Sequence, residues 1–463
     1  MQEKNVKIIN NTSKNGQTKC PKCGASNLFY DETKHKLICN YCSGEYELEK
    51  VDGKEEAKTL SGESRGSATK DIDQDASSII TIRCDGCGAE IVLNTEETLH
   101  TQCHWCGSTL SINHQIDNGI VPDEILPFLL TREQAFQNIY RYVENKLDFA
   151  SKEFTDGLSE KNVRGVYFPY FIIDSKAHGK YVGVGEHNTR VIHHDDSTYY
   201  DADVYHIERE FDVTVDDLTI ESNLNRLDIF NTKEKNTVIN AIMPFDTQNC
   251  IQFNANYLKE YTSEKRDVDV KEIEGKVSSE VNDIVRKQLT PSLKKYDRGV
   301  RWESEELIFE GKQWLSAYLP VWLYSCQDKK GTLHYVAVNG RTGETVGSIP
   351  KDNSRLALII GLIFGTSVVL GILFLFLFFP IALFIFFVGF VTSLIIFIVE
   401  DYKYANLVWK RHHYETETKC SLNYTNCVDQ QIDKLHRVSH AFTPKANSHK
   451  VYGDFISVKK NTK

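Results

Sequence analysis

Several features of common protein classes are missing from this sequence of 463 residues. It contains neither a G-x-x-x-x-G-K-[ST] phosphate-binding loop nor an H-E-x-x-H metalloprotease motif, and we expect that the chain is not an enzyme. It also lacks an excess of basic residues, because 54 Lys and Arg against 64 Asp and Glu give a net charge of −10. This balance excludes a strongly basic nucleic-acid-binding protein as a description of the whole chain.

Cysteine is scarce, and the 12 residues present are too few for a disulfide-rich scaffold. The first residues, MQEKNVKIINNTSKNG, contain no apolar core of a secretory signal. We therefore expect the cysteines to remain in a reducing compartment, where paired thiols are typical metal ligands.

Eight of the cysteines form four C-x-x-C pairs in two modules that repeat with a period of 64 residues. In each module fifteen residues separate the two pairs, and Gly24, Gly88 and Gly107 directly follow the second cysteine of a pair. Glycine tolerates the positive φ that curls backbone N–H groups toward the sulfur atoms. Short apolar runs with a turn lie between the pairs and predict two strands.

This pattern predicts two zinc ribbons, which we name the first ribbon (15–50) and the second ribbon (79–112). Four thiolates close a tetrahedral shell, so each ribbon should hold one structural Zn²⁺ ion. The eight predicted ligands are Cys20, Cys23, Cys39, Cys42, Cys84, Cys87, Cys103 and Cys106. Redox-active or free thiols are the alternative, which the identical spacing of the two copies disfavours. We expect His100 and His104 to lie at the surface or beside the ligands.

Charge in the ribbons argues against phosphate recognition. Residues 79–119 carry one Arg and five acids, whereas residues 1–58 carry ten Lys and nine acids. A nucleic-acid surface needs clustered basic residues. The first ribbon offers only one local group, which we interpret as a solvated face: Lys14, Lys19, Lys22, Lys34 and Lys36. Residues 51–78, rich in Ser, Gly and charge, predict a flexible linker that lets the ribbons move independently.

Charge is entirely absent from residues 356–399. Two apolar stretches, 356–379 and 381–399, flank Pro380 and would be about 36 and 28 Å long as helices, against a hydrocarbon core of about 30 Å. They predict a transmembrane helical hairpin in the lipid bilayer of the cell membrane. Basic residues on both flanks predict that both termini are cytoplasmic. A wedge that dips into the bilayer and a buried hairpin in a soluble protein are the alternatives.

Gly361 and Gly365 form a G-x-x-x-G step in the first apolar stretch. Such a step permits close helix contact, which we place opposite Gly389, Thr392 and Ser393. The alternative is that these glycines reflect only the general frequency of glycine in membrane helices.

Residues 120–350 predict an α+β middle domain. Thr131 to Gln134 form a capping-box signature before an amphipathic helix, and a second helix is expected near 266–289. The apolar face expected for the first helix consists of Phe136, Ile139, Tyr140, Val143, Leu147 and Phe154. Aromatic and β-branched runs predict strands whose Tyr and Phe residues form the sheet core, and Asn339 to Gly343 predict a turn. We interpret His193 to Asp196 as a polar hairpin tip rather than a metal cluster, because neighbouring residues on a strand point to opposite faces.

The last segment, 400–463, is predicted to be a basic cytoplasmic tail. Residues 401–463 hold eleven Lys and Arg and six acids, a charge of +5. Basic segments next to a bilayer attract anionic headgroups, so the tail is expected to lie along the membrane. The fold class predicted is therefore multidomain, with two small β zinc ribbons, an α+β middle domain, a transmembrane hairpin and a basic tail.

The order of these elements resembles a bacterial family of membrane-anchored double-zinc-ribbon proteins, the YdjG-like proteins. Members are often labelled TFIIB-type zinc ribbon or primosomal-protein-N'-like. The sequence motifs shared with this family come after the two ribbons and are TREQA, GVYFPYF, YLPVWLY and VNGRTGETVG. The resemblance implies zinc at the eight cysteines and a platform that recruits phage-shock protein A under envelope stress, next to an SPFH-type protein.

Three functions from different classes are compatible with this sequence, and one of the two less favoured is an enzyme with a pocket of convergent titratable groups in residues 120–350. The favoured one is a non-enzymatic membrane adaptor or scaffold that faces the cytoplasm and binds a phage-shock-protein-A-type or SPFH-type partner. The alternative is a membrane-tethered nucleic-acid-binding protein linked to replication. Nucleic acid is the less favoured partner because the ribbons lack clustered basic charge.

Overall fold

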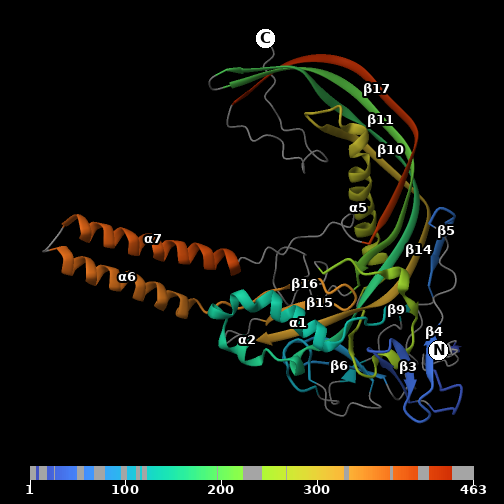
Figure 1. The fold of residues 1–463 in the computed structure, drawn as a ribbon. Helices are drawn as coiled ribbons and strands as arrows, with labels where there is room; N and C mark the ends of the chain where they lie inside the picture. The colour runs from blue at the N-terminus through green and yellow to red at the C-terminus, as the bar shows by residue number, and fades with distance from the viewer. Residues whose placement is uncertain are drawn as a thin grey trace, which may run out of the picture.

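The computed structural model of this chain describes residues 7–9, 18–25, 27–48, 57–66, 79–94, 102–110, 115–116, 122–194, 197–222, 242–266, 268–327, 333–375, 379–404 and 417–440. Two clusters of four cysteines lie near the N-terminus, the middle of the chain is rich in β-sheet, and two apolar helices follow. Figure 1 shows a tall curved sheet above a denser lower part, from which the two helices project to one side.

The strands vary in length from two to 31 residues. They are β1 (Lys7–Ile9), β2 (Leu28–Asp31), β3 (Lys36–Cys39), β4 (Glu45–Leu48), β5 (Gly62–Arg65), β6 (Ile79–Arg83), β7 (Glu90–Asn94), β8 (Gln115–Ile116), β9 (Glu124–Ile125), β10 (Arg164–His194), β11 (Ser197–Glu221), β12 (Ile251–Gln252), β13 (Thr262–Glu264), β14 (Val300–Gln327), β15 (Leu333–Asn339), β16 (Thr345–Gly347) and β17 (Lys419–His440).

The α-helices in the described ranges are α1 (Arg132–Val143), α2 (Lys152–Gly157), α5 (Val270–Leu289), α6 (Asn353–Leu375) and α7 (Phe379–Tyr404). Short 3₁₀ turns are η2 (Glu144–Phe149), η3 (Glu160–Asn162), η4 (Thr247–Asn249), η5 (Ala255–Leu258) and η6 (Thr290–Leu293).

Strands β14, β10, β11 and β17 form the tall part of the sheet as antiparallel neighbours. The burial pattern of β14 changes halfway along the strand. Val300 to Glu310 alternate between covered and open side chains, whereas Gly311 to Tyr324 are continuously buried. Alternation is typical of a sheet with one solvated face, and a continuous buried run is typical of a sheet covered on both faces. The upper half is therefore covered on one side and the lower half on two.

Helix α5 covers the inner, concave face of the upper half (Figure 1). Its buried side chains recur every three or four residues and lie in one apolar cluster with strands β10, β11 and β14: Ile273, Val277, Val281, Ile284, Val285 and Leu289. This spacing produces one apolar stripe along a helix. The helix predicted near 266–289 is confirmed.

The first predicted helix is shorter than its periodicity suggests. Thr131 caps α1 with the expected capping box to Gln134, but α1 ends at Val143. A 3₁₀ turn follows, and Ser151 then caps α2, which carries the buried Phe154. Tyr140, expected on the apolar face, is 48% exposed. Ala135, Ile139 and Val143 form the buried stripe instead.

The chain on either side of the predicted middle domain joins the same sheet. β5 pairs in parallel with residues 311–314 of β14, so part of the predicted flexible linker is a strand. β17 pairs with β11 from Asp216 to Ser197, so residues 419–440 of the predicted tail are also a strand. Residues 405–416 and 441–463, including Lys410 and Arg411, lie outside the described residues.

Helices α6 and α7 pack against each other and project away from the sheet (Figure 1). Their apolar parts, Asn353–Leu373 and Phe379–Glu400, are long enough to cross a bilayer. Pro380 lies in the first turn of α7 rather than between the helices, because proline fits a helix start whose N–H has no partner. Side chains such as Leu373 and Phe387 are largely exposed, as expected for a surface that faces lipid.

The contact between α6 and α7 does not use the predicted G-x-x-x-G step. A Cβ at Gly389 would overlap the side chain of Ser367, and one at Gly371 would overlap the ring of Phe386. A Cβ at Gly361 or Gly365 would meet nothing within 4 Å. The predicted contact between this step and Gly389 is therefore wrong, and Gly389 lies against Ser367 instead.

Candidate metal centres

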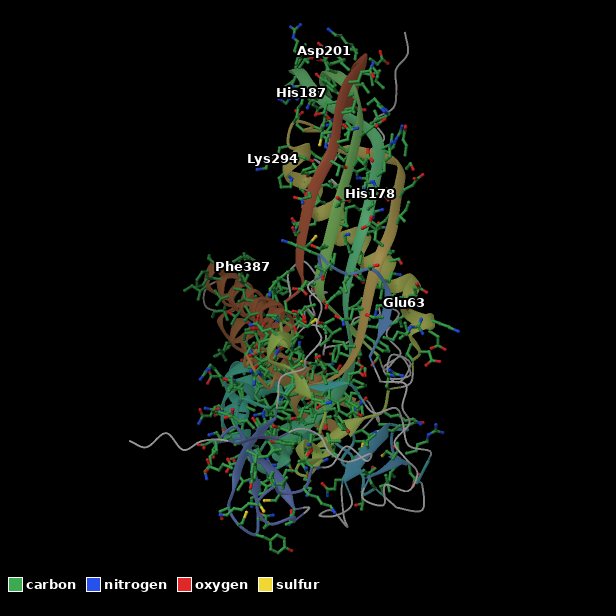
Figure 2. The ribbon with its side chains drawn as sticks, turned by 90° about the vertical axis from the view of Figure 1, so that its right-hand side faces the viewer. Glu63, His178, His187, Asp201, Lys294 and Phe387 are labelled. Atoms are coloured by element: carbon green, nitrogen blue, oxygen red, sulfur yellow. The ribbon has the colours of Figure 1, made fainter. Side chains whose placement is uncertain are left out.

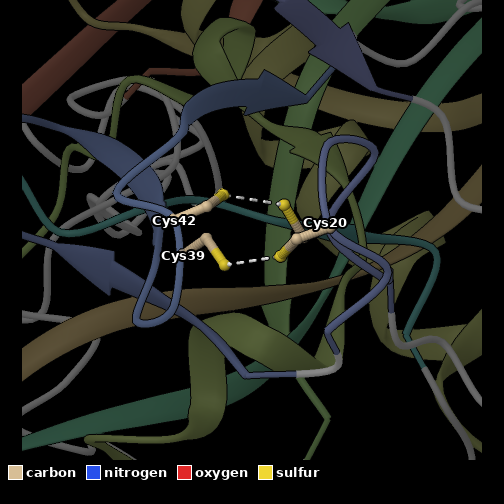
Figure 3. Close-up of side chains that lie close together, drawn as sticks. Cys20, Cys39 and Cys42 are labelled. Carbon is tan, nitrogen blue, oxygen red and sulfur yellow. Dashed lines mark hydrogen bonds between the residues drawn. The ribbon is translucent and has the colours of Figure 1, made fainter.

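The four cysteines of the first ribbon converge between the loop before β2 and the end of β3. The Sγ atoms of Cys20 and Cys42 are 3.5 Å apart, and those of Cys23 and Cys39 are 3.6 Å apart (Figure 3). Tyr46 from β4 adds a hydroxyl group 3.1 Å from Cys20 Sγ. All four sulfur atoms lie within 4.8 Å of one another.

The second ribbon repeats this geometry. The Sγ pairs Cys84–Cys106 and Cys87–Cys103 are each separated by 3.6 Å, and all four atoms again lie within 4.8 Å. Tetrahedral zinc with Zn–S bonds of about 2.3 Å requires sulfur atoms about 3.8 Å apart. Both clusters therefore fit one Zn²⁺ ion, and the softness of thiolate ligands suits this metal.

Each C-x-x-C pair forms the same tight backbone turn. The N–H groups of Gly24, Gly88 and Gly107 donate to the carbonyl of the first cysteine of the pair at 2.8–3.0 Å, and φ is +73° to +77°. The fourth turn uses Ser43, with φ of +51° and the same hydrogen bond to Cys39. The predicted positive φ at the three glycines is confirmed.

The thiols of a cluster do not ionise independently. Burial opposes ionisation of Cys20, but hydrogen bonds from Tyr46 and from the N–H groups of Cys23 and Lys22 lower its pKa to about 6. For Cys23, a hydrogen bond from Ala25 N–H favours the thiolate, yet desolvation and the other three thiols raise its pKa to about 12. Four thiolates at this distance need a compensating cation, and zinc supplies it at the cost of releasing protons.

The first ribbon packs into the core of the lower half. Tyr30 of β2 is buried, donates to the carbonyl of Phe128 at 2.6 Å, and its ring centroid lies 4.8 Å from that of Tyr257. Asn254 Nδ2 donates to Thr18 Oγ1 at 2.6 Å on the other side of the ribbon. These contacts join residues more than 90 positions apart, so this ribbon is a fixed part of the body.

The second ribbon is joined to the central sheet. β7 pairs with β13, and β13 pairs with β10. Glu264 of β13 is buried and accepts hydrogen bonds from His104 Nε2 at 3.2 Å and from Trp105 Nε1. The hydroxyl of Thr262 lies 3.0 Å from His104 Nδ1. The independent motion predicted for the ribbons is therefore wrong.

The two histidines near the second cluster have different outcomes. His104 is fully buried between Glu264 and Thr262, beside the predicted ligand Cys103 rather than at the surface. His100 lies outside the described residues. Nothing in the sequence marks Glu264 or Thr262 as partners, because they follow His104 by about 160 positions.

The basic group of the first ribbon pairs with its own acids. Lys34 lies 3.3 Å from Glu45, and Lys36 lies within 4.0 Å of both Glu45 and Glu47. Lys19 and Lys22 are exposed, and Lys14 lies outside the described residues. Exposed pairs of this kind are typical of a solvated face.

Two acidic or polar features lie elsewhere on β10 and β11. His193 is near the end of β10, and β11 begins at Ser197, which agrees with a hairpin tip. Asp195 and Asp196 are not among the described residues.

Asp174, Asp216 and Asp217 gather at a bulge where Asp217 N–H donates to Asp174 Oδ1 at 2.7 Å. This hydrogen bond holds the positive φ of Asp217.

The predicted zinc ligands are thus brought together in two groups of four, and the chain fits a zinc-binding protein with two apolar helices that can span a membrane. Comparisons with protein-family models, with curated proteins and with solved structures find no match to this chain.

Proposed function

We propose that this chain is a membrane-anchored, zinc-binding adaptor whose role is docking rather than catalysis. A zinc ion with four cysteine ligands has no open coordination position for a substrate, which favours a structural role. The observation that carries the proposal is that both ribbons, the tall sheet and the base of the hairpin belong to one connected body.

The base of the hairpin is held by the lower half of that body. Ser151 N–H donates to the carbonyl of Pro350 at 2.8 Å, and Asp352 N–H donates to the carbonyl of Phe149 at 2.7 Å. Asp352 Oδ1 then accepts from Arg355 N–H at 3.0 Å at the start of α6. These bonds support a fixed orientation of the ribbons and the sheet relative to the membrane.

The pairing of β17 with β11 supports a topology in which both flanks of the hairpin lie on one side of the membrane. Twenty residue pairs link these strands, although one precedes the hairpin and the other follows it. Strands on opposite sides of a bilayer cannot pair. The reducing environment that the eight thiols need favours the cytoplasmic side.

The resemblance described above suggests a phage-shock-protein-A-type or SPFH-type protein as the partner. The full chain in lipid nanodiscs should bind such a purified protein, and removal of zinc with a chelator should abolish binding because the ribbons lose their structure. Binding that is unaffected by chelation would contradict a role for the ribbons. Salt-sensitive capture of DNA or RNA without a protein partner would favour the nucleic-acid alternative.

A further inference from the structure

The two ribbons contain the same turn at their second C-x-x-C pair. The modules repeat with a period of 64 residues, so Tyr41 of the first ribbon corresponds to Trp105 of the second. The N–H groups of Ser43 and Gly107 donate to the carbonyl of the third cysteine of their ribbon at 2.9 and 3.0 Å, and both residues have positive φ. Tyr41 and Trp105 therefore occupy equivalent places in equivalent turns.

The turn of the second ribbon is docked onto the central sheet. Trp105 is 2% exposed, and its ring centroid lies 5.9 Å from that of Phe168 and 5.3 Å from that of Tyr335. Its Nε1 donates to the buried carboxylate of Glu264, which also lies 3.2 Å from His104 Nε2. This turn therefore places an aromatic ring in an apolar pocket and gives the polar tip of the ring to a carboxylate.

The turn of the first ribbon is open to solvent. Tyr41 is 76% exposed, more than any other large apolar side chain in the described ranges, and Asn40 is exposed beside it. Figure 1 shows β3 and β4 on the side of the lower body opposite to the hairpin. Figure 2 shows the blue strands of this ribbon at the lower end of the molecule, with Phe387 of the hairpin above them and Asp201 at the opposite end. A protein that approaches from the side away from the membrane can therefore reach the turn.

Charge distinguishes the two ribbons in the same region. Lys19 and Lys22, which flank the first cluster, are exposed, and neither forms an ion pair with the described part of the chain. In the second ribbon the equivalent of Lys22 is Gly86, and Arg83, the equivalent of Lys19, is paired with Glu90. Both zinc centres would carry the same charge, and the second ribbon already contacts a carboxylate. The two lysines make the first ribbon more favourable for such a contact.

We propose that the first ribbon docks onto an acidic segment of a partner protein, with Tyr41 as the aromatic anchor and Lys19 and Lys22 as the cations that pair with its carboxylates. Tyrosine is common among the residues that dominate the energy of an interface. Its hydroxyl can donate to a carboxylate, as Trp105 Nε1 does to Glu264. This inference rests on the proposed adaptor function, because it names the surface through which the adaptor binds.

A phage-displayed library of random linear peptides tests the proposal. The library is depleted on the Tyr41→Ala variant and then selected on the zinc-loaded full chain in nanodiscs. The selected peptides should be rich in Asp and Glu. A synthetic copy should bind the parent chain saturably, and Tyr41→Ala should weaken its binding about tenfold or more. Lys22→Glu should weaken binding several-fold. The control Tyr140→Ala changes an exposed tyrosine of α1 and should leave binding unchanged.

Two further variants separate the ring from its hydrogen-bond donor. Tyr41→Trp introduces the residue of the second ribbon, keeps both features and should retain binding. Tyr41→Phe keeps only the ring and should weaken binding several-fold. Zinc content and melting temperature should stay unaltered, because the side chain is exposed. The proposal is overturned if no selected peptide depends on Tyr41, if the selected peptides lack an excess of acids, or if oligonucleotides bind this surface in their place.

Failure of this inference is distinguishable from failure of the adaptor function. If a purified phage-shock-protein-A-type or SPFH-type protein binds Tyr41→Ala as tightly as the parent chain, the adaptor function stands and this docking surface is wrong. If acidic peptides depend on Tyr41 whereas neither protein binds the parent chain, the docking surface stands and the suggested partners are wrong.

Discussion

Glu264 shows how one buried carboxylate connects a small metal-binding module to a large sheet. It is 2% exposed and accepts hydrogen bonds from both His104 and Trp105 of the second ribbon. A buried acceptor of this kind stabilises the folded state. If it is removed, its two donors stay buried without a partner, and the protein then bears the full free-energy cost of their desolvation.

We expect Glu264→Ala to lower the free energy of unfolding by about 1–3 kcal/mol, because His104 and Trp105 both lose this acceptor. Glu264→Gln retains an oxygen acceptor and should cost less. Thermal unfolding of the full chain in detergent measures both. Glu303→Ala, at a half-exposed site paired with Arg301, is the control and should change stability by less than about 0.5 kcal/mol. Equal effects of all three substitutions would contradict the role given to Glu264.

Glu417, just before β17, predicts a pH dependence. Burial raises its pKa from 4.5 to about 7, although hydrogen bonds from Thr219 and from the Phe245 N–H favour the charged form. Among the described residues, its Oε1 has no hydrogen-bond partner. Because the folded pKa is raised, the stabilisation by the protonated group is complete below about pH 4.5 and is lost as pH rises through about 7.

Glu417→Gln should therefore match the parent protein near pH 5 and exceed its stability near pH 8 by about 1–3 kcal/mol. Melting curves at the two pH values measure the difference. The exposed substitution Glu303→Gln should show no such divergence. A Glu417→Gln protein that is less stable than the parent at pH 8 would show that the carboxylate is paired when charged.

At the scale of elements, we expect each ribbon to depend on the zinc ion that its four cysteines can hold. The parent chain should carry two Zn²⁺ ions, and Cys39→Ser should carry one, as measured by elemental analysis of the purified protein. Cys427→Ser, which changes an exposed thiol of β17, should keep both ions. Retention of two ions by Cys39→Ser would refute the first centre.

The same substitution should also reduce the stability of the lower body. Cys20, Cys39, Leu28 and Tyr30 belong to one apolar cluster with Phe128 and Tyr257. Loss of the first ion should therefore lower the melting temperature of the whole chain, in contrast to the local unfolding that a flexible linker would allow.

The helices of the hairpin predict different effects for different glycines. Gly389→Ala should destabilise the pair of helices by about 1–3 kcal/mol, because the new methyl group overlaps Ser367. Gly361→Ala faces open space and should be neutral or slightly stabilising, since alanine favours a helix. Thermal melting in detergent compares the two, and a larger loss for Gly361→Ala would show that the helices pack through the other face.

For the whole molecule, the shared sheet predicts the labelling of thiols in intact cells. Cys427 is exposed on β17, and a membrane-impermeant maleimide should label it only after permeabilisation. The variant Cys427→Ser identifies the labelled site. In that background, Phe379→Cys at the far end of the hairpin should react from outside if the helices cross the bilayer. Labelling of Cys427 from outside the cell would show that the topology is the reverse of the proposed one. Failure of the Phe379→Cys thiol to react from outside would indicate a wedge that does not cross the bilayer.

The sequence by itself determined the features that depend on near neighbours. The spacing of each C-x-x-C pair, the capping box at Thr131, the periodicity of α5 and the charge-free run at 356–399 each act within a few residues or turns. Local backbone geometry and the burial of one face are sufficient to specify such elements.

Only the tertiary structure decided how these elements join. β5 and β17 carry polar, charged residues that suggested a linker and a tail, yet each completes its hydrogen bonds on a distant strand. His104 likewise meets its partners about 160 positions away. Backbone groups of an edge strand take any suitable partner, whatever the side chains, so local sequence carries little information about pairing between distant segments.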